Sequence, residues 1–429
     1  MTFDMNGRAL EQIYTVPRRL YVARMRTVLI SGASIAGLSL AYWLRRHGFE
    51  PTLVERSPAL RSGGQAIDIR GTARDAVERM GIMDAVKAHH TGTHGIAWLD
   101  EQGKRVAAMG GDDFGDSGGI VAEIEILRGD LVRILHEAAG TDLEILYDTV
   151  ITEIAESAEG VKVTFDNAPP RSFDLVVGAD GLRSGVRALT FGQDKEFVQD
   201  LGYYTSYFPA RTELDLDGWE VMYNLPAGNG VDGRVAVLYP LGNTGEVRAL
   251  LGFVSPELAY DRRDLRAQKE LLADVFAGAG WEIPALLDQL RRTDDLYFAR
   301  VGEVQVDHWY RGRTVLLGDS AFGGSLGMGT SMALVGAYVL AGELAAAKGD
   351  HRVAFPRYDS EMREYVTMNM KRPPGGAGGF APRTRRGIRM RNRFMRLLPH
   401  LPGSGKMLGG MQKAANSITL KPYAPRSHE

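Results

Sequence analysis

Residues 27–55 read TVLISGASIAGLSLAYWLRRHGFEPTLVE, and each residue class falls where a strand, a glycine turn, a helix and a second strand need it. The apolar run 28–30 predicts a strand, Gly32 permits a turn too tight for a side chain, and a helix is expected from about Ile35. Backbone N–H groups at such a helix start bind a pyrophosphate. The stretch therefore predicts a dinucleotide site on an α/β fold.

Three more residues of the stretch support this prediction. Gly37 lets the helix pack closely on the strand, and Ser34 occupies the middle glycine position of the motif, where a small side chain is tolerated. Glu55 ends the second strand about 20 residues after the turn, where an acid binds ribose hydroxyls. An ordinary glycine-containing turn is the alternative, but the order of strand, helix and acid favours a nucleotide site.

Composition limits the function classes. The chain has 429 residues, of which 44% are hydrophobic and 24% charged, as expected for a soluble protein with two packed domains. A net charge of -2 argues against nucleic-acid binding. The absence of cysteine excludes disulfides, thiolate catalysis and cysteinyl zinc or iron–sulfur sites, and it fits a cytoplasmic protein.

No metal or membrane role is expected. The histidines at positions 89, 90 and 94 indicate a helix end and not a metal site. The apolar runs 28–44 and 331–348 are interrupted by small residues and by Glu343, which favours buried helices over membrane spans. Residues 1–26 have the scattered charges of an N-terminal extension.

Acidic residues end three apolar runs that lie far apart in the chain. Asp180 follows the run 175–177 and Asp319 follows the run 314–317, in the manner of Glu55. Carboxylates at the carboxyl edge of a parallel sheet accept hydrogen bonds from ribose or ribityl hydroxyls. Three such acids predict one extended cofactor.

Between these runs the sequence changes character. Residues 201–254 alternate apolar and polar side chains between turn signals, which predicts a separate antiparallel sheet. A single long helix is expected over 73–89. The basic residues 371–429 predict two amphipathic helices, 385–398 and 404–415, packed on the nucleotide domain with solvated cations outside; an anionic partner is the alternative.

These residues resemble the FAD-dependent aromatic hydroxylases, the single-component monooxygenases that include polyketide and tetracycline-modifying enzymes. The resemblance implies a discontinuous, GR2-type Rossmann-like FAD-binding domain with an inserted antiparallel substrate sheet and C-terminal helices. The expected parts are an extension (1–26), the FAD-binding domain (27–95, 120–195 and 305–370), the substrate-binding sheet (96–119 and 196–304) and a basic helical segment (371–429).

The resemblance also implies the residues that contact FAD. The glycine turn takes the pyrophosphate, Glu55 the adenosine ribose and Asp319 the ribityl chain. Residues 63–68 lie beside the flavin ring. The full set is Gly32, Ser34, Ile35, Ala36, Gly37, Glu55, Arg56, Asp68, Arg128, Asp180, Gly318, Asp319, Gly327, Met328 and Gly329.

One loop departs from the family pattern. Residues 318–331 read GDSAFGGSLGMGTS, without the usual proline and with Met328 in place of a glutamine. Gly327 and Gly329 still present backbone N–H groups at a helix start, where negative charge on a reduced flavin is favoured. Flavin binding is therefore expected, whereas oxygen chemistry is less firmly indicated.

The function that the resemblance implies is monooxygenation. NADH or NADPH reduces FAD transiently, and a flavin C4a-hydroperoxide hydroxylates or epoxidises an electron-rich polyketide or aromatic compound of the kind made in antibiotic biosynthesis. Tyr203, Tyr207 and Met222 are expected to line the substrate site, and no catalytic acid or base is assigned. We expect a small-molecule substrate and a monomer or homodimer.

Other functions remain open at this stage. A redox-neutral cyclase that keeps FAD as a structural cofactor would suit the altered loop. A flavin halogenase is disfavoured because only Trp281-Glu282-Ile283-Pro284 matches its tryptophan motif. A reductase of isoprenoid chains or a non-catalytic binding protein is also compatible with the sequence.

Overall fold

The structure, a computed structural model, describes residues 26–61, 63–111, 124–241, 245–262, 264–325, 327–371, 379–401 and 404–423. The expected N-terminal extension lies outside the described residues except for its last residue, Arg26, which begins the first strand. Residues 112–119 of the expected substrate sheet also lie outside them.

A six-stranded sheet forms the half of the molecule that carries the glycine turn. Its order is β17-β18-β11-β1-β2-β7, and every neighbouring pair is parallel except β17 with β18. The carboxyl ends of β1, β11 and β18 therefore meet at one edge, as a doubly wound sheet requires. The strands are β1 (Arg26–Ser31), β2 (Phe49–Val54), β7 (Ile145–Leu146), β11 (Leu175–Gly178), β17 (Tyr310–Arg311) and β18 (Thr314–Leu316).

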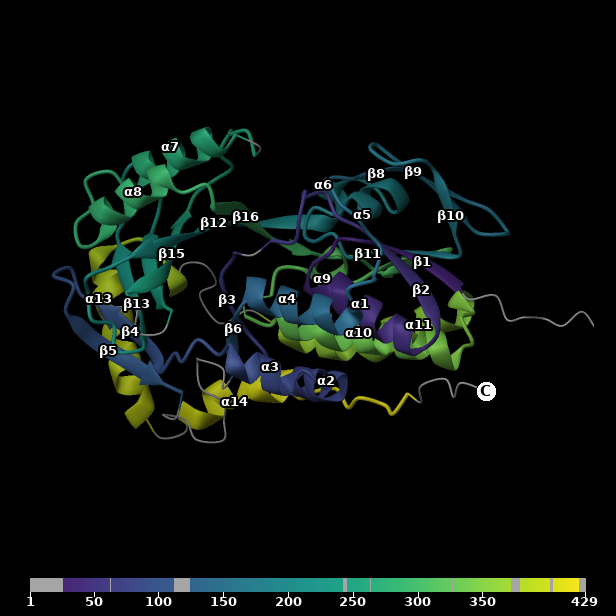
Figure 1. Cartoon of the computed structure of the whole chain (residues 1–429). Coiled ribbons are helices and arrows are strands. Elements are labelled where there is room, and N and C mark those ends of the chain that lie inside the picture. Colours follow the sequence, from purple (N-terminus) through teal and green to yellow (C-terminus); the bar gives the residue numbers. More distant parts are fainter. Residues whose placement is uncertain are drawn as a thin grey trace, which may run out of the picture.

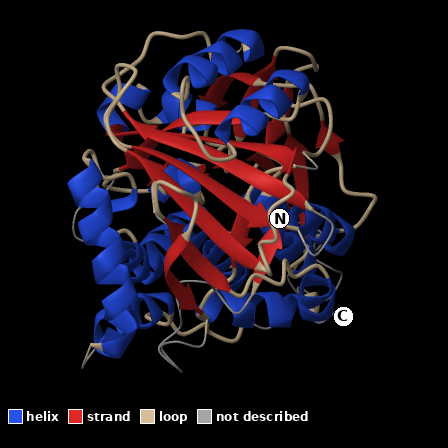
Figure 2. Cartoon of the chain, turned by 90° about the vertical axis from the view of Figure 1, so that its left-hand side faces the viewer, coloured by secondary structure: helices blue, strands red, loops and turns tan. Residues whose placement is uncertain are grey.

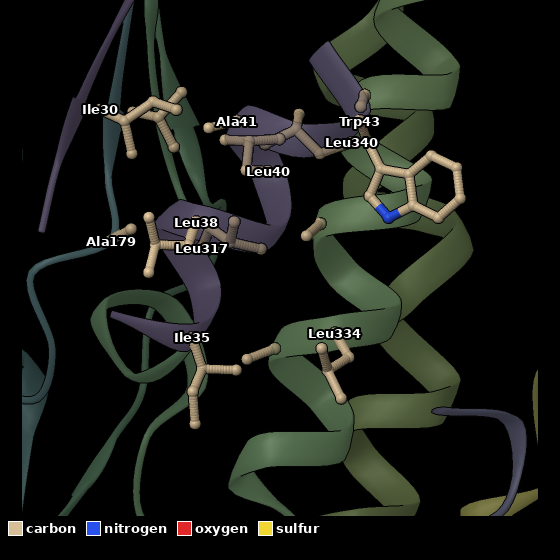
Figure 3. Packing of buried hydrophobic residues seen from close by; sticks show 14 of the residues in the cluster. Ile30, Ile35, Leu38, Leu40, Ala41, Trp43, Ala179, Leu317, Leu334 and Leu340 are labelled. Carbon is tan, nitrogen blue, oxygen red and sulfur yellow. The ribbon is translucent and has the colours of Figure 1, made fainter. Parts of the chain in front are cut away.

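Helices cover one face of this sheet, and the three-stranded sheet β10-β9-β8 shares the core from the other side (Figure 1). Figure 3 shows helix α1 packed between the strands and helix α10, with Leu38 toward the sheet and Leu334 on α10. The helices and small strands are α1 (Ile35–Arg46), α4 (Arg128–Ala139), α5 (Gly185–Thr190), α6 (Asp194–Phe197), α9 (Asp319–Phe322), α10 (Gly329–Ala346), α11 (His351–Asn369), β8 (Ile151–Glu156), β9 (Val161–Phe165) and β10 (Arg171–Phe173).

Helix α10 is long and apolar enough to cross a membrane, but 78% of it is buried inside the fold. Its buried side chains pack against α1, α2 (Thr72–Met80) and α11, so it is apolar on all sides because protein surrounds it. It is a core helix, as expected from Glu343 and the small residues along its length.

A seven-stranded sheet forms the other half of the molecule (Figure 2). Its order is β16-β12-β15-β14-β13-β4-β5, and it is antiparallel except where β13 pairs with β4. Helices α7 and α8 cover one face and helix α13 packs on part of the other. The elements are β4 (Gly95–Leu99), β5 (Arg105–Gly110), β12 (Val198–Arg211), β13 (Trp219–Leu225), β14 (Arg234–Pro240), β15 (Glu246–Val254), β16 (Tyr297–Val304), α7 (Leu265–Val275), α8 (Ile283–Arg292), α13 (Arg385–Leu397) and the short η2 (Leu398–His400).

A two-stranded ribbon of β3 (Ala66–Asp68) and β6 (Glu125–Leu127) lies between the two halves (Figure 1). Its register pairs Asp68 with Glu125. Both strands thus bring carboxyl side chains to the region where the two halves meet.

Two expectations about helices are wrong. The single helix expected over 73–89 is two helices, α2 (Thr72–Met80) and α3 (Met83–Ala88), because Gly81 takes a left-handed conformation with φ 76° that ends α2. Of the two C-terminal helices, only α14 (Ser404–Ala415) packs on the nucleotide-binding half, against α11. Helix α13 packs on β5 and β13 of the seven-stranded sheet instead.

The close packing of α1 on the turn after β1 predicts a large effect at Gly37. A Cβ atom at this position would lie 1.9 Å from the carbonyl oxygen of Gly32, which is backbone and has little room to move. We expect Gly37→Ala to destabilise the protein by about 3 kcal/mol. A lower thermal unfolding midpoint is the measurement.

The matched control is Gly280→Ala, because nothing lies within 4 Å of a Cβ atom there. Equal unfolding midpoints for the two variants would contradict the packing argument.

Candidate active site

The turn after β1 is bare backbone that another chain segment approaches closely. Gly32 has φ 107°, and a Cβ atom there would lie 2.4 Å from the carbonyl oxygen of Ala179. Ser34 is the N-cap residue of α1 but makes no side-chain cap. Its hydroxyl oxygen instead accepts a hydrogen bond of 2.7 Å from a guanidinium nitrogen of Arg128. The helix start is therefore open, with a cation beside it.

Glu55 is held at the mouth of the same turn. One carboxylate oxygen accepts the backbone N–H of Ala33 at 3.0 Å, and the other accepts that of Ser57 at 2.9 Å. These bonds fix the carboxylate between the end of β2 and the glycine turn, where the sequence predicts an acid for a ribose.

Three arginines gather next to the glycine turn. Desolvation by the surrounding protein lowers the pKa of Arg61, and repulsion from Arg56 and Arg128 lowers it further. Within the described ranges, no ion pair joins any of the three to an acid. Guanidinium groups that converge without carboxylate partners form an anion site. This charge, beside an open helix start, fits a pyrophosphate.

Asp319 lies farther along the same crevice. Its side chain is exposed to solvent, yet desolvation raises its pKa, and Arg128 is the opposite charge that acts on it. Solvent reaches the Asp319 side chain although protein closely surrounds it. Asp319 therefore lines a recess in the surface. Tyr297 shares this environment, because burial raises its pKa and the charges of Arg128, Asp319 and Arg61 all reach its hydroxyl. The crevice thus joins acids from distant parts of the chain.

The start of α10 borders the recess. A Cβ atom at Gly329 would lie 3.5 Å from a carboxylate oxygen of Asp319, and one at Gly327 would lie 3.9 Å from a carboxylate oxygen of Asp68. The structure therefore brings residues 327–329, Asp319 and the 63–68 segment together, as the sequence predicts. The Asp68 carboxylate pairs with Arg70 at 2.8 Å.

Some predicted contact residues have their side chains elsewhere. Ile35 and Met328 are buried, at 7% and 4% exposure, so their side chains are packed inside the protein. Ala36 packs against Gly318, where an added Cβ atom would lie 3.0 Å from the Ala36 methyl group. A direct bond from any of these residues to a cofactor stays a prediction.

Asp180 is occupied by bonds to the protein. Its carboxylate accepts hydrogen bonds from the hydroxyls of Ser31, Ser184 and Ser320 and from the backbone N–H of Val186. These bonds join β1, the turn after β11 and helix α9. The structure thus gives Asp180 a positioning role, and its predicted contact with the cofactor remains untested.

One face of the seven-stranded sheet forms an aromatic wall toward the crevice. Tyr203, Tyr207 and Met222, the residues predicted to contact substrate, share this face with Tyr239. The ring of Tyr207 lies 6.4 Å from that of Tyr239 and 6.1 Å from that of Tyr297, which interacts with the Asp319 and Arg128 charges. The wall therefore extends from the sheet to the nucleotide-binding edge.

A buried carboxyl pair lies where this wall meets β6. Glu220, on β13, hydrogen-bonds to Glu125, on β6, and desolvation followed by the Glu125 charge raises the pKa of Glu220 far above its usual range. Glu125 also accepts the hydroxyls of Thr91 and Thr93. Burial likewise raises the pKa of Asp68, to about 6.

The sequence analysis missed this pair, as well as Arg61 and Tyr297. A signal for Glu220 did exist, because it precedes Met222 by two residues and a strand places such residues on one face. Arg61 and Tyr297 lie outside any motif, and only the three-dimensional fold brings them to the crevice.

Comparison with known proteins supports the predicted family. A family model described as an FAD binding domain matches residues 25–371. A flavin-dependent monooxygenase of Legionella longbeachae is 35% identical over 349 residues, which cover 80% of this chain and 87% of that protein. An uncharacterised protein of Mycobacterium tuberculosis is 42% identical over 361 residues, which cover 82% of this chain and 95% of that protein. The crystal structure of tetracycline destructase Tet(51) is similar with a TM-score of 0.76 and 31% identity, over 93% of this chain and 99% of that one.

The raised pKa of Glu220 predicts a pH-dependent stability. A carboxyl whose pKa is higher in the folded than in the unfolded state stabilises the fold fully below the unfolded pKa, and this contribution is lost as the pH rises. The Glu220→Gln variant does not lose this stabilising contribution at higher pH, because an amide does not ionise. We therefore expect the variant to gain thermal stability relative to the natural protein between about pH 5 and 8.

Thermal midpoints of both proteins across this range test the prediction. The control is Glu213→Gln at an exposed position before β13, where the gain expected for Glu220→Gln should not appear. If the thermal midpoints of Glu220→Gln and of the natural protein change with pH in parallel, Glu220 ionises as readily in the folded as in the unfolded protein. The prediction would then be wrong.

Proposed function

Because this chain belongs to the FAD-binding flavin-dependent monooxygenases, we propose that its reaction is the hydroxylation or epoxidation of an electron-rich polyketide or aromatic compound. The electron donor is NADH or NADPH, and the second substrate is O₂. The observation that carries this proposal is the aromatic wall of Tyr207, Tyr239 and Tyr297, which joins the substrate sheet to the edge that carries Asp319.

The residues of the crevice fit FAD along its length. In our proposal the pyrophosphate lies against residues 32–37 and Arg128, the adenosine ribose at Glu55 and the ribityl chain at Asp319. The flavin ring then lies between residues 327–329 and Asp68. When bound and reduced, FAD supplies the activation of O₂ that no side chain provides. The open N-terminus of α10 favours negative charge beside the ring.

The wall would bind and orient the substrate. Burial raises the pKa of Tyr207 to about 12 and that of Tyr239 well above its usual value, so both hydroxyls stay protonated at neutral pH. Neutral phenols pack on a flat aromatic substrate and hydrogen-bond to its oxygens. The same burial excludes water, which protects reactive oxygen species from wasteful hydrolysis.

Two further points support the substrate class and the compartment. The similar structure at 31% identity is a tetracycline destructase, whose name gives tetracycline as its target. The chain contains no cysteine, which fits a reducing cytoplasm. We accordingly propose a cytoplasmic enzyme of natural-product metabolism.

The test is flavin reduction and oxygen transfer by the purified, FAD-loaded protein. Under anaerobic conditions NADPH or NADH should bleach the visible flavin band, faster when an aromatic polyketide is present. Under ¹⁸O₂ the product should carry one labelled oxygen atom. Conversion of a polyketide without NAD(P)H or O₂, with the flavin band unchanged, would favour a redox-neutral cyclase and refute the proposal.

The cofactor assignment gives a separate prediction at Arg128. Loss of one charged hydrogen bond to a phosphate costs enough that Arg128→Met should raise the dissociation constant of FAD about 10-fold to 100-fold. Titration of FAD fluorescence with apoprotein measures it.

Arg133→Met is the control on the same helix, because Arg133 pairs with Asp130 and Glu137 on the exposed side of α4. If Arg128→Met binds FAD as tightly as Arg133→Met, the phosphate does not lie at Arg128.

A further inference from the structure

Exposed apolar side chains concentrate at the C-terminal helices. Among the described residues ten large hydrophobic side chains are exposed, and five of them fall within 390–411. Met390, Phe394 and Leu397 on α13 are 60%, 45% and 52% exposed, and Leu401 just beyond it is 45% exposed. The three helical positions recur every three or four residues, so they form one stripe along the helix, and Leu401 follows just after its end. Exposed apolar stripes of this kind mark interaction surfaces.

The same stripe is cationic. Arg386, Met390, Arg393 and Leu397 follow one another at helical spacing, so cations and apolar side chains alternate along the outer face of α13. Exposed Arg396 lies on the flank of that face. Residues 379–401 contain no acid. Within the described chain, Arg386, Arg393 and Arg396 have no ion pair, whereas Arg385 and Arg389 on the flank share Glu101.

The opposite face of α13 is already used. Ile388, Asn392 and Leu398 are buried against the seven-stranded sheet, and Figure 1 shows α13 on the outer side of β13 and β5. The helix is therefore anchored on one side by protein, which leaves the Met390–Leu397 stripe directed outward. A helix with this pattern lies in a lipid interface with its apolar side chains among acyl chains and its arginines at the headgroups.

We propose that the outer face of α13 docks the protein onto a membrane surface rich in anionic lipid. Its apolar stripe (Met390, Phe394, Leu397 and Leu401) enters the interface, and Arg386, Arg393 and Arg396 pair with lipid phosphates. The sequence alone led us to expect solvated cations and no membrane contact. The proposal differs because the apolar stripe is seen to be exposed only once α13 is placed on the sheet.

The charge of the outer face of α13 favours an anionic membrane over other possible partners. If two copies of the chain met through α13, the unpaired arginines of one would face those of the other, since a two-fold interface repeats the same patch. A nucleic acid would pair with the arginines but leave Met390 and Leu397 against phosphates. An anionic bilayer satisfies the cationic and the apolar side chains together.

The docking face has a direct structural link to the aromatic wall. Arg391, on the inner side of α13, donates a hydrogen bond to the side-chain oxygen of Asn224 and contacts the sulfur of Met222 at 3.8 Å. Both partners lie on the wall side of β13. Docking through α13 would thus hold the wall near the lipid surface, where apolar compounds concentrate.

Vesicle flotation of the full-length, FAD-loaded protein tests the proposal. We expect flotation with vesicles of phosphatidylglycerol and phosphatidylcholine, weakening as salt increases, and little with phosphatidylcholine alone. The double variant Arg393→Gln/Arg396→Gln should lower the partition coefficient about 30-fold. The double variant Phe394→Ser/Leu397→Ser should lower it about tenfold or more.

Matched controls change similar side chains elsewhere. Arg266→Gln/Arg291→Gln removes two exposed arginines of α7 and α8, and Leu189→Ser/Leu214→Ser removes two apolar side chains that are 43% and 38% exposed. Both controls should float like the natural protein, and all variants should keep its thermal midpoint. Absence of flotation with anionic vesicles, or equal losses in the controls, would overturn the proposal. So would a dimer in sedimentation that Phe394→Ser/Leu397→Ser converts to monomer.

Discussion

The contact between helix α1 and the turn after β1 is the constraint on which the rest of the site depends. The absence of side chains at Gly32 and Gly37 lets the helix start against the strand ends, with the carbonyl oxygen of Ala179 also within touching distance of Gly32. A side chain at Gly32 would meet the backbone of Ala179, and one at Gly37 would push α1 away from the sheet. This shift would reorient the first backbone N–H groups of α1. It would also move Ser34, with its hydrogen bond from Arg128, away from Glu55. One packing distance thus sets the geometry of the anion site.

The crevice has a charge imbalance that the protein does not correct internally. Arg56, Arg61 and Arg128 crowd together, while at the opposite end Asp319 is desolvated and Asp68 is held by Arg70. Such groups cost folding free energy when no ligand is present. A long ligand with two phosphates at one end and hydroxyls farther along would relieve both costs. Its binding should therefore also stabilise the fold, since a ligand that binds only the folded state adds its binding free energy.

The sequence was sufficient for features that depend on local geometry. Gly32, Ile35 and Glu55 were placed by the strand–turn–helix pattern, and parallel strands necessarily bring Asp319 to the edge that carries Glu55. Alternation in the second sheet predicted an antiparallel sheet, but only the structure shows that Tyr203, Tyr207 and Met222 share one face. What the sequence did not reveal depends on contacts between distant elements. Arg61 and Tyr297 meet only because the loop after β2 lies against β16, and the position of α13 follows from the sheet face that it covers.

The buried pair of Glu220 and Glu125 is harder to explain by stability alone. Two carboxyls joined by one hydrogen bond cannot both ionise at low cost, and this adds to the desolvation that raises the pKa of Glu220. An apolar pair would fill the same space without that cost, as buried ion pairs in other proteins indicate. The pair is retained where the aromatic wall meets the strand that carries Asp68, between the proposed substrate and the proposed flavin position. An ionised Glu220 would add a negative charge beside the proposed flavin position, and its raised pKa opposes that ionisation.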